Sequence, residues 1–162
     1  MQSAPIPKDE KERLKKLFEM SILDTEPEER FDVITRDVIR VFNVPISTIT
    51  IIDEKREWYK SCQGLEVKEA PRAVSFCAHA MLSRDVFIVE DTLKDDRFKD
   101  NPMVVNPPHI RFYAGAALRS EDGINIGVFC VKDTKPRSFS NQEVGMLLDF
   151  AARAEAELKK SK

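Results

Sequence analysis

Hydrophobic residues recur at helical spacing in three segments of the 162-residue chain. In residues 8–20 the apolar positions lie three and four apart among charged ones, which predicts a short amphipathic helix. Residues 31–42 repeat this spacing, and "NVP" after them predicts the end of that helix, because a proline pushes the preceding residue out of the helical region. Residues 141–158 carry the longest stripe. The pattern therefore predicts helices at both ends of the chain.

Polar residues ahead of two of these segments match helix N-caps. Thr25 and Glu28 in "TEPE" predict a capping box, in which a side chain at each position satisfies a free backbone donor. Ser140 and Glu143 predict the same arrangement before the last helix. The second helix is therefore expected to begin near Thr25.

Between the helices the apolar period becomes strand-like, with β-branched and aromatic residues in short runs. The expected strands are residues 46–53, 57–64, 85–91, 111–120 and 124–133. "EDG" between the last two predicts a hairpin, which requires antiparallel pairing. The order of elements predicts an α+β fold, with the terminal helices on one face of an antiparallel sheet and loops on the other. A small-molecule pocket is expected on the loop-covered face.

Composition narrows the possible classes of function. Hydrophobic residues make up 42% of the chain and charged residues 33%, as in globular proteins. The net charge of −2, with both signs interspersed, does not indicate a nucleic-acid-binding surface. We find neither a membrane-length apolar run nor a signal peptide, and three widely spaced cysteines argue against a disulfide framework. These features predict a cytoplasmic protein without nucleic-acid or membrane partners.

Several motifs together resemble one family. "ILDTEPEERFD", "SFCAHAM", "DDRFKDNPMV", "IRFYAGAAL" and "GVFCVKDTKPRSFS" occur in the order typical of GAF domains, in the subgroup found at the N-terminus of bacterial sensor histidine kinases and diguanylate cyclases. The resemblance covers roughly residues 22–158. It implies a PAS-like antiparallel sheet of five to six strands, a pocket on one face and dimerising helices on the other. GAF ligands are diverse, so the resemblance leaves the cofactor unknown.

The resemblance also predicts how the chain is organised. Residues 1–21 are expected to form an N-terminal dimerisation helix, residues 22–158 the GAF domain and residues 159–162 a tail. The stripes on residues 11–20 and 141–158 are expected to pack across a two-fold axis in a homodimer. An output kinase or cyclase domain is a possible further partner.

Cys77 and His79 in "VSFCAHAM" raise the question of a reaction centre. On a helix these two positions point in different directions, and no further cysteine or histidine lies at a zinc-binding spacing, so no metal site is expected. Nucleophilic chemistry, as in GAF-type methionine sulfoxide reductases, would need a thiol of lowered pKa beside a base. The cysteine spacing differs from that branch.

Pigment binding is the other alternative at this motif. Phytochrome-like GAF domains often attach a bilin to a cysteine followed directly by histidine, whereas Ala78 intervenes here and the "DIP"-type tripeptide is absent. Haem could use His79 or His109 as an axial ligand. The simplest interpretation is a packed lid, in which Phe76 and Met81 enter the core, Cys77 is a small buried hydrophobe and His79 bonds to a loop carbonyl or carboxylate.

Two other segments contain possible ligand-binding residues. Asp91 precedes "DDRFKDNP" and Arg97 lies within it, and both could hold a polar ligand. In the alternative interpretation, the acidic residues of this loop satisfy backbone groups while Phe98 anchors the loop. In "RFYAGAAL", alternation places Arg111 and Tyr113 on one face of the strand, as the floor or rim of a pocket.

The sequence as a whole predicts a non-catalytic sensory module that binds a small molecule and signals through helix-mediated dimerisation in bacterial signal transduction. The candidate ligand-binding residues are Cys77, His79, Asp91, Arg97, Arg111 and Tyr113. The alternative is chemistry centred on Cys77, either as a covalent bilin photoreceptor or as a reductase of the methionine-sulfoxide type.

Overall fold

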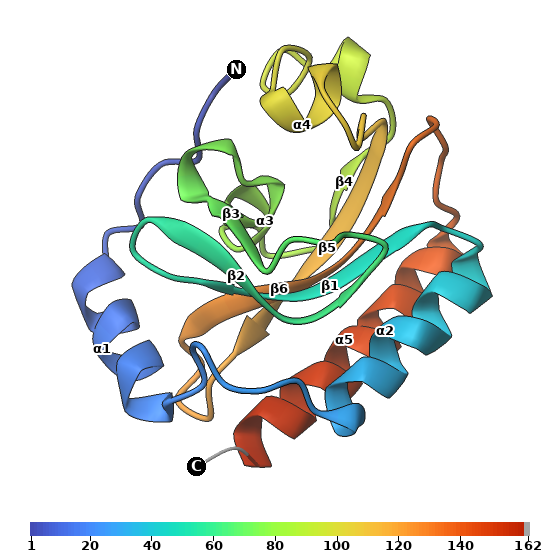
Figure 1. The fold of residues 1–162 in the computed structure, drawn as a ribbon. Coiled ribbons are helices and arrows are strands. Elements are labelled where there is room, and N and C mark those ends of the chain that lie inside the picture. The colour runs from blue at the N-terminus through green and yellow to red at the C-terminus, as the bar shows by residue number, and fades with distance from the viewer. Residues whose placement is uncertain (161–162) are drawn as a thin grey trace.

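A six-stranded antiparallel sheet forms the centre of the computed structural model, which describes residues 1–160 (Figure 1). The strand order is β3-β2-β1-β6-β5-β4, and every neighbouring pair is antiparallel. The strands are β1 (Ile46–Ile52), β2 (Arg56–Gln63), β3 (Glu69–Pro71), β4 (Phe87–Val89), β5 (Phe112–Arg119) and β6 (Asn125–Asp133). The five expected strands and the α+β class are confirmed. The short edge strand β3 was not predicted, because its three residues offer no alternating pattern.

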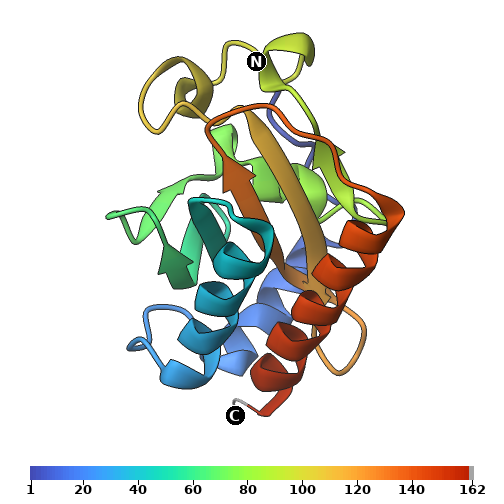
Figure 2. The same ribbon diagram turned by 90° about the vertical axis from the view of Figure 1, so that its right-hand side faces the viewer.

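Three long helices cover one face of this sheet, and short helices and loops cover the other (Figures 1 and 2). The helices are α1 (Glu10–Met20), α2 (Glu29–Phe42), α3 (Phe76–Ala80), α4 (Pro102–Val105) and α5 (Asn141–Lys160), with 3-10 turns η1 (Arg72–Val74) and η2 (Thr92–Lys94). Helices α2 and α5 run side by side under the sheet (Figure 2). No helix among residues 1–160 is long and apolar enough to cross a membrane.

The two predicted capping boxes have different outcomes. At α5, Ser140 Oγ accepts a hydrogen bond from the Glu143 amide at 3.1 Å, and the Glu143 carboxylate accepts one from the Ser140 amide at 3.0 Å. At α2 the prediction was wrong, because the helix begins at Glu29 and Glu28 makes no side-chain cap. The Thr25 hydroxyl instead donates to the Ile22 carbonyl and accepts from the Lys60 ammonium. The Thr25 side chain thus makes a tertiary contact with Lys60 in place of the expected capping contact.

The helix-covered face contains the larger hydrophobic core. Alternate residues of β5, namely Phe112, Ala114, Ala116 and Leu118, point into it as the alternation predicted. Helix α1 contributes Leu17, and α5 contributes Leu147, Ala151, Ala154 and Leu158. Much of the two terminal stripes is therefore buried against the chain's own sheet, while Phe18 and Leu148 stay exposed.

The loop-covered face contains a second core beneath α3, α4 and the loops around them. Phe76 stacks on Phe98 with ring centroids 4.2 Å apart, and Tyr113 lies 5.3 Å from Phe76 on the sheet side. All three side chains are fully buried. The packed lid expected at "FCAHAM" is confirmed, since Phe76, Cys77 and Met81 all lie in this core.

The chain ends differ in part from the expected division. Helix α1 is docked on the domain, because the buried Arg13 guanidinium donates to the Ile52 carbonyl at 2.8 Å. At the other end, α5 continues through Lys160, so residues 159 and 160 of the expected tail are helical. Residues 161 and 162 of that tail lie outside the described part of the chain.

Candidate functional site

Buried polar side chains line the loop-covered face of the central strands. Alternation along β6 points Val128, Cys130 and Lys132 toward this face, because Phe129 and Val131 belong to the core under the helices. The polar and thiol groups of the face are Thr48, Thr50, Glu57, Tyr59, Ser75, Cys77, Tyr113, Cys130 and Lys132. We call this set the inner site.

Two hydroxyl groups hold the carboxylate of Glu57 at one end of the inner site. The phenol of Tyr59 and the hydroxyl of Ser75 each donate to one Glu57 oxygen. Ser75 is also the N-cap of α3 and accepts from the Ala78 amide at 2.9 Å. Burial and the Glu57 charge raise the pKa of the Tyr59 phenol far above its ordinary value, so Tyr59 remains a donor. The carboxylate is thereby linked to the start of the lid helix.

Lys132 contributes a buried ammonium group from the other side of the inner site. Its side chain is 1% exposed, and the charge of Glu57 acts on it across the site. Burial alone would lower the pKa of this amine, but the charges of Glu57 and of the neighbouring thiols raise it above its ordinary value. Lys132 is therefore a buried cation at neutral pH.

The two buried thiols lie between these charged groups. The phenol of Tyr113 donates to Cys77 Sγ at 3.1 Å, and Cys130 Sγ lies 3.1 Å from the hydroxyl oxygen of Thr48. Burial, followed by the interaction with Cys130, raises the pKa of Cys77 well above its usual range. Burial also acts to raise the pKa of Cys130, but the neighbouring Cys77 and the charge of Lys132 lower it below its usual range. Of the two thiols, Cys77 is thus the poorer nucleophile.

The six predicted ligand-binding residues separate into three groups. Cys77 and Tyr113 meet in the inner site. His79 and Arg97 lie on the outer side of the lid, where His79 Nε2 is 2.9 Å from the Gln2 carbonyl and the Arg97 guanidinium lies 5.3 Å from the Phe98 ring centroid. The expected carbonyl partner of His79 is thereby confirmed.

Asp91 and Arg111 form the third group, an ion pair of 3.0 Å between the segment after β4 and the residue just before β5. Asp91 also accepts from the Leu93 amide and so caps the turn η2. Arg97 pairs with Asp95 at 2.7 Å, not with Asp91 or Asp96. The interpretation in which acidic residues satisfy backbone groups while Phe98 anchors the loop therefore fits this segment.

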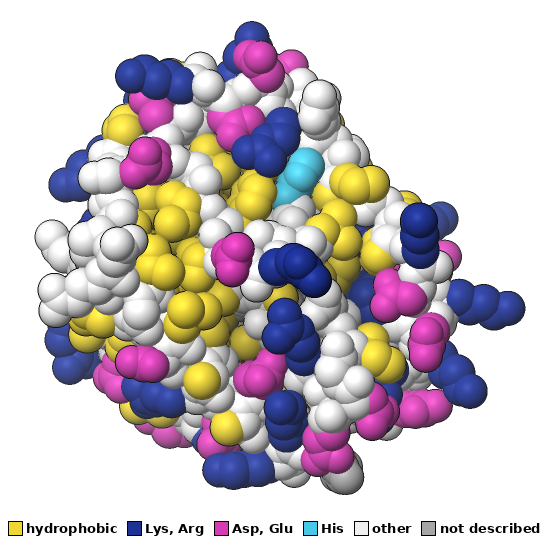
Figure 3. All heavy atoms as spheres, turned by 180° about the vertical axis from the view of Figure 1, so that it is seen from behind, with side chains coloured by type: hydrophobic (Ala, Val, Ile, Leu, Met, Phe, Trp, Pro, Cys, Tyr) yellow, Lys and Arg dark blue, Asp and Glu magenta, His cyan; other side chains and the backbone are white. Residues whose placement is uncertain are grey.

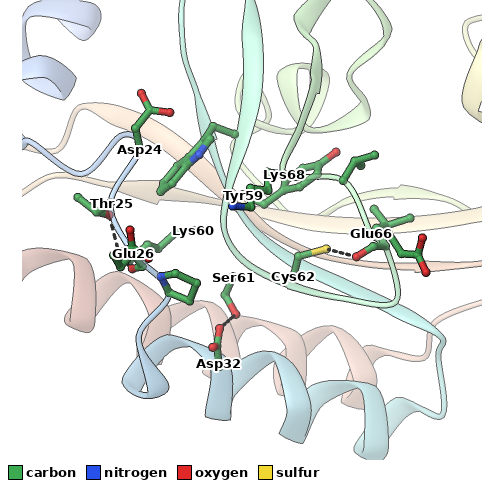
Figure 4. Close-up of a pocket in the computed structure, with 14 residues that line it drawn as sticks. Asp24, Thr25, Glu26, Asp32, Tyr59, Lys60, Ser61, Cys62, Glu66 and Lys68 are labelled. Carbon is green, nitrogen blue, oxygen red and sulfur yellow. Dashed lines mark hydrogen bonds between the residues drawn. The ribbon is translucent and has the colours of Figure 1, made fainter.

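A hollow of about 370 Å³ lies beside the inner site, at the β2 edge of the sheet (Figure 4). Residues 24–27 and 65–68 form its walls, and Tyr59 and Cys62 line it as well. The ammonium of Lys60 donates to the Thr25 hydroxyl at 2.8 Å and to the Glu26 carbonyl at 2.6 Å, and it pairs with Glu28 at 2.8 Å. The Lys60 ammonium at this hollow is therefore fully used by the protein.

Sequence reasoning missed Glu57, Cys130 and Lys132. A signal was present in "NIGVFCVKD", since strict alternation puts Lys132 on the same face as Cys130 and Val128. A charged residue in a strand is usually exposed. Lys132 is buried because the lid covers this face of the sheet, and the sequence pattern does not reveal that cover. Among residues 1–160, no three His, Cys, Asp or Glu side chains are grouped in a way that could hold a metal ion.

Comparisons with known proteins agree with the fold. The GAF domain profile matches residues 26–158, so this chain belongs to the GAF domain family. The chain is 40% identical over 152 residues to a cyclic di-GMP phosphodiesterase of Pseudomonas aeruginosa. The match covers 93% of this chain but only 26% of that protein.

Two solved structures show the same architecture at low sequence identity. The GAF domain of an Acinetobacter phosphoenolpyruvate-protein phosphotransferase is 16% identical, with a TM-score of 0.64 and 92% of each chain covered. The type II free methionine-R-sulfoxide reductase of Thermoplasma acidophilum is 13% identical, with a TM-score of 0.66 over 82% of this chain and 92% of that one. At this identity the likeness concerns the fold alone.

Proposed function

We propose that this GAF domain is a non-catalytic sensor that binds a small molecule at the inner site and signals through its terminal helices. The observation that carries the proposal is the set of buried polar groups in the inner site, in which the charged side chains of Glu57 and Lys132 lie under the lid. Taking charged groups out of water costs several kcal/mol per ion, on the order of the whole stability of a domain. Buried ionisable groups with shifted pKa values occur more often at functional sites than elsewhere in a protein.

A continuous set of contacts leads from the inner site to helix α1. Ser75 bonds to Glu57 in the site and follows directly on the turn η1. Arg72 in that turn pairs with Glu10 in the first turn of α1. A ligand that shifts Glu57 or the lid would therefore disturb the docking of α1, which supports signalling through that helix.

The relative from Pseudomonas supports a role in signal transduction. Because this chain spans about a quarter of that phosphodiesterase, we propose that it acts on an output domain, in the bacterial cytoplasm. The candidate activities of that output domain are therefore those of a kinase, a cyclase and a cyclic di-GMP phosphodiesterase. Cys77-centred pigment or reductase chemistry receives less support, because a fully buried thiol with a raised pKa is a poor nucleophile.

Native mass spectrometry and absorbance of the protein purified from its own host test ligand binding. We expect a non-covalent added mass that disappears on denaturation, in both the wild type and Cys77→Ala. A visible absorbance band, or a mass that survives denaturation in the wild type and is lost in Cys77→Ala, would instead favour the pigment. Bare protein in both forms, with no thermal shift from any metabolite in a screen, would contradict the proposal.

Dimerisation has its own test, which uses an exposed hydrophobic residue of α5. Hydrophobic side chains also gather in one area of the surface seen from behind (Figure 3). Leu148 on α5 is 47% exposed. We expect a dimer at micromolar concentration and a dissociation constant at least about tenfold higher for Leu148→Asp, because the interface would then bury an unpaired charge. Sedimentation velocity measures this, with Leu93→Asp on the opposite layer as the control. A wild-type monomer would refute the dimer.

A further inference from the structure

We propose that residues 2–5 form a strap that holds the lid closed over the inner site. This inference rests on the function proposed above and concerns the regulation of the same site. The lid consists of η1, α3 and the loop of residues 95–101, and hydrogen bonds join the N-terminal segment to all three. In Figure 1 this segment runs from α1 past the lid toward the loop beside α4.

The backbone of Gln2 joins two parts of the lid that are distant in the chain. Its amide donates to the Arg97 carbonyl at 3.0 Å, and its carbonyl accepts from His79 Nε2 at 2.9 Å. The His79 ring also lies edge-on to the buried Phe98 ring, with centroids 4.9 Å apart. Gln2 therefore closes the seam between α3 and the loop of residues 95–101.

A second residue of the strap holds the turn η1. The Ser3 hydroxyl donates to the Ala73 carbonyl at 2.7 Å. The preceding residue of the turn, Arg72, pairs with Glu10 of α1. The strap and α1 thus hold adjacent residues of η1, and both belong to one continuous N-terminal segment. A displacement of α1 would therefore also pull on the strap, so the position of α1 and the closure of the lid are coupled.

The strap is held less firmly than the lid beneath it. None of residues 1–5 is buried, and polar contacts at the surface attach them to the lid. In contrast, Phe76, Cys77 and Phe98 are fully buried. Exposed hydrogen bonds with few buried apolar contacts open at a small cost in free energy, whereas core segments open only with much of the domain. The strap is therefore the part of this cover that can be released while the domain stays folded.

Alkylation of Cys77 tests the strap without any ligand, because this fully buried thiol lies in the core under the lid. After a pulse of N-ethylmaleimide on the native protein, trypsin places Cys62, Cys77 and Cys130 in separate peptides. We expect Cys77 to react at least about tenfold faster in a variant that lacks residues 2–5, because its hydrogen bonds to the lid disappear. The partly exposed Cys62 at the β2 edge should keep its wild-type rate and is the internal reference.

Two substitutions at Gln2 give a matched pair in which the chain stays intact. Gln2→Pro removes the amide that donates to Arg97, so Cys77 should react about threefold faster or more. Gln2→Ala keeps both backbone hydrogen bonds and should react like the wild type. Because Gln2 is exposed, neither change removes core packing. Amide hydrogen exchange in residues 73–84, which contain α3, should follow the same order.

Three results would overturn the inference. An unchanged Cys77 rate in the absence of residues 2–5 would mean that the strap does not hold the lid. A parallel rise at Cys62 and Cys77 would mean that the truncation destabilises the whole domain. Equal Cys77 rates in Gln2→Pro and Gln2→Ala would exclude closure of the seam by the Gln2 backbone. The proposed sensory function is tested separately, because native mass spectrometry detects a retained molecule whether or not the strap controls the lid.

Discussion

Replacing Phe76 with alanine is expected to destabilise the domain by about 3–5 kcal/mol, the usual cost of removing a buried aromatic ring. Phe76 is fully buried, stacks on Phe98 at 4.2 Å and contacts the Tyr113 layer below. Its loss leaves a cavity between the lid and the sheet that surrounding side chains only partly fill. Urea denaturation followed by circular dichroism measures the change.

The control for this experiment is Phe18→Ala. Phe18 is 54% exposed on α1, and its truncation should cost less than about 1 kcal/mol. Because Phe76 contributes to the lid of the inner site, Phe76→Ala should also weaken ligand binding in the folded fraction. A loss of stability below about 1 kcal/mol for Phe76→Ala would mean that the lid is not packed on the sheet as described.

Replacing Glu10 with glutamine is expected to destabilise the domain by about 2 kcal/mol at pH 7, after allowance for solvent screening. Burial acts to raise the pKa of Glu10, but hydrogen bonds and charge from Arg13 and Arg72 lower it from 4.5 to about 2. The carboxylate also accepts from the Arg13 Nε at 2.8 Å. Loss of the charge leaves two largely buried guanidinium groups without their common partner.

The pH dependence gives this prediction a definite sign. Because the folded-state pKa of Glu10 lies below the unfolded value, its contribution is fully present above about pH 5 and is lost as the pH falls from 4.5 toward 2. The difference between wild type and Glu10→Gln should therefore shrink in acid, as measured by urea denaturation at a series of pH values. Glu12→Gln, an exposed neighbour on α1, is the control and should change stability by less than about 0.5 kcal/mol. A difference that persists below pH 2 would contradict the Glu10 assignment.

These two predictions test the same set of contacts, which connects the lid helix α3 to helix α1. Phe76 belongs to the helix that Ser75 caps, and Glu10 holds the turn that leads to Ser75. If the lid and α1 are coupled, Glu10→Gln should also lower the affinity of the inner site for its ligand. A double-mutant cycle with Lys132→Met would measure that coupling directly.

The comparison of sequence and structure shows where local reasoning suffices. Periods of 3.6 and 2 residues located the three long helices and five of the strands, because one buried face per element imposes that pattern. Alternation in β5 also placed Phe112 in the core under the helices and Tyr113 on the loop face. Local motifs were less dependable, since the cap expected at Thr25 was replaced by its contact with Lys60.

The sequence by itself determined the α+β class, the GAF resemblance and the burial of Phe76 and Cys77, since each depends on neighbouring residues or on a recognisable order of motifs. Only the tertiary structure decided that Lys132 and Glu57 share an enclosed face and that Arg97 and Asp91 belong to separate ion pairs. Burial of a charge depends on which distant segment covers it. Here that segment is a lid about fifty residues away from Lys132 in the chain, and no local pattern encodes that contact.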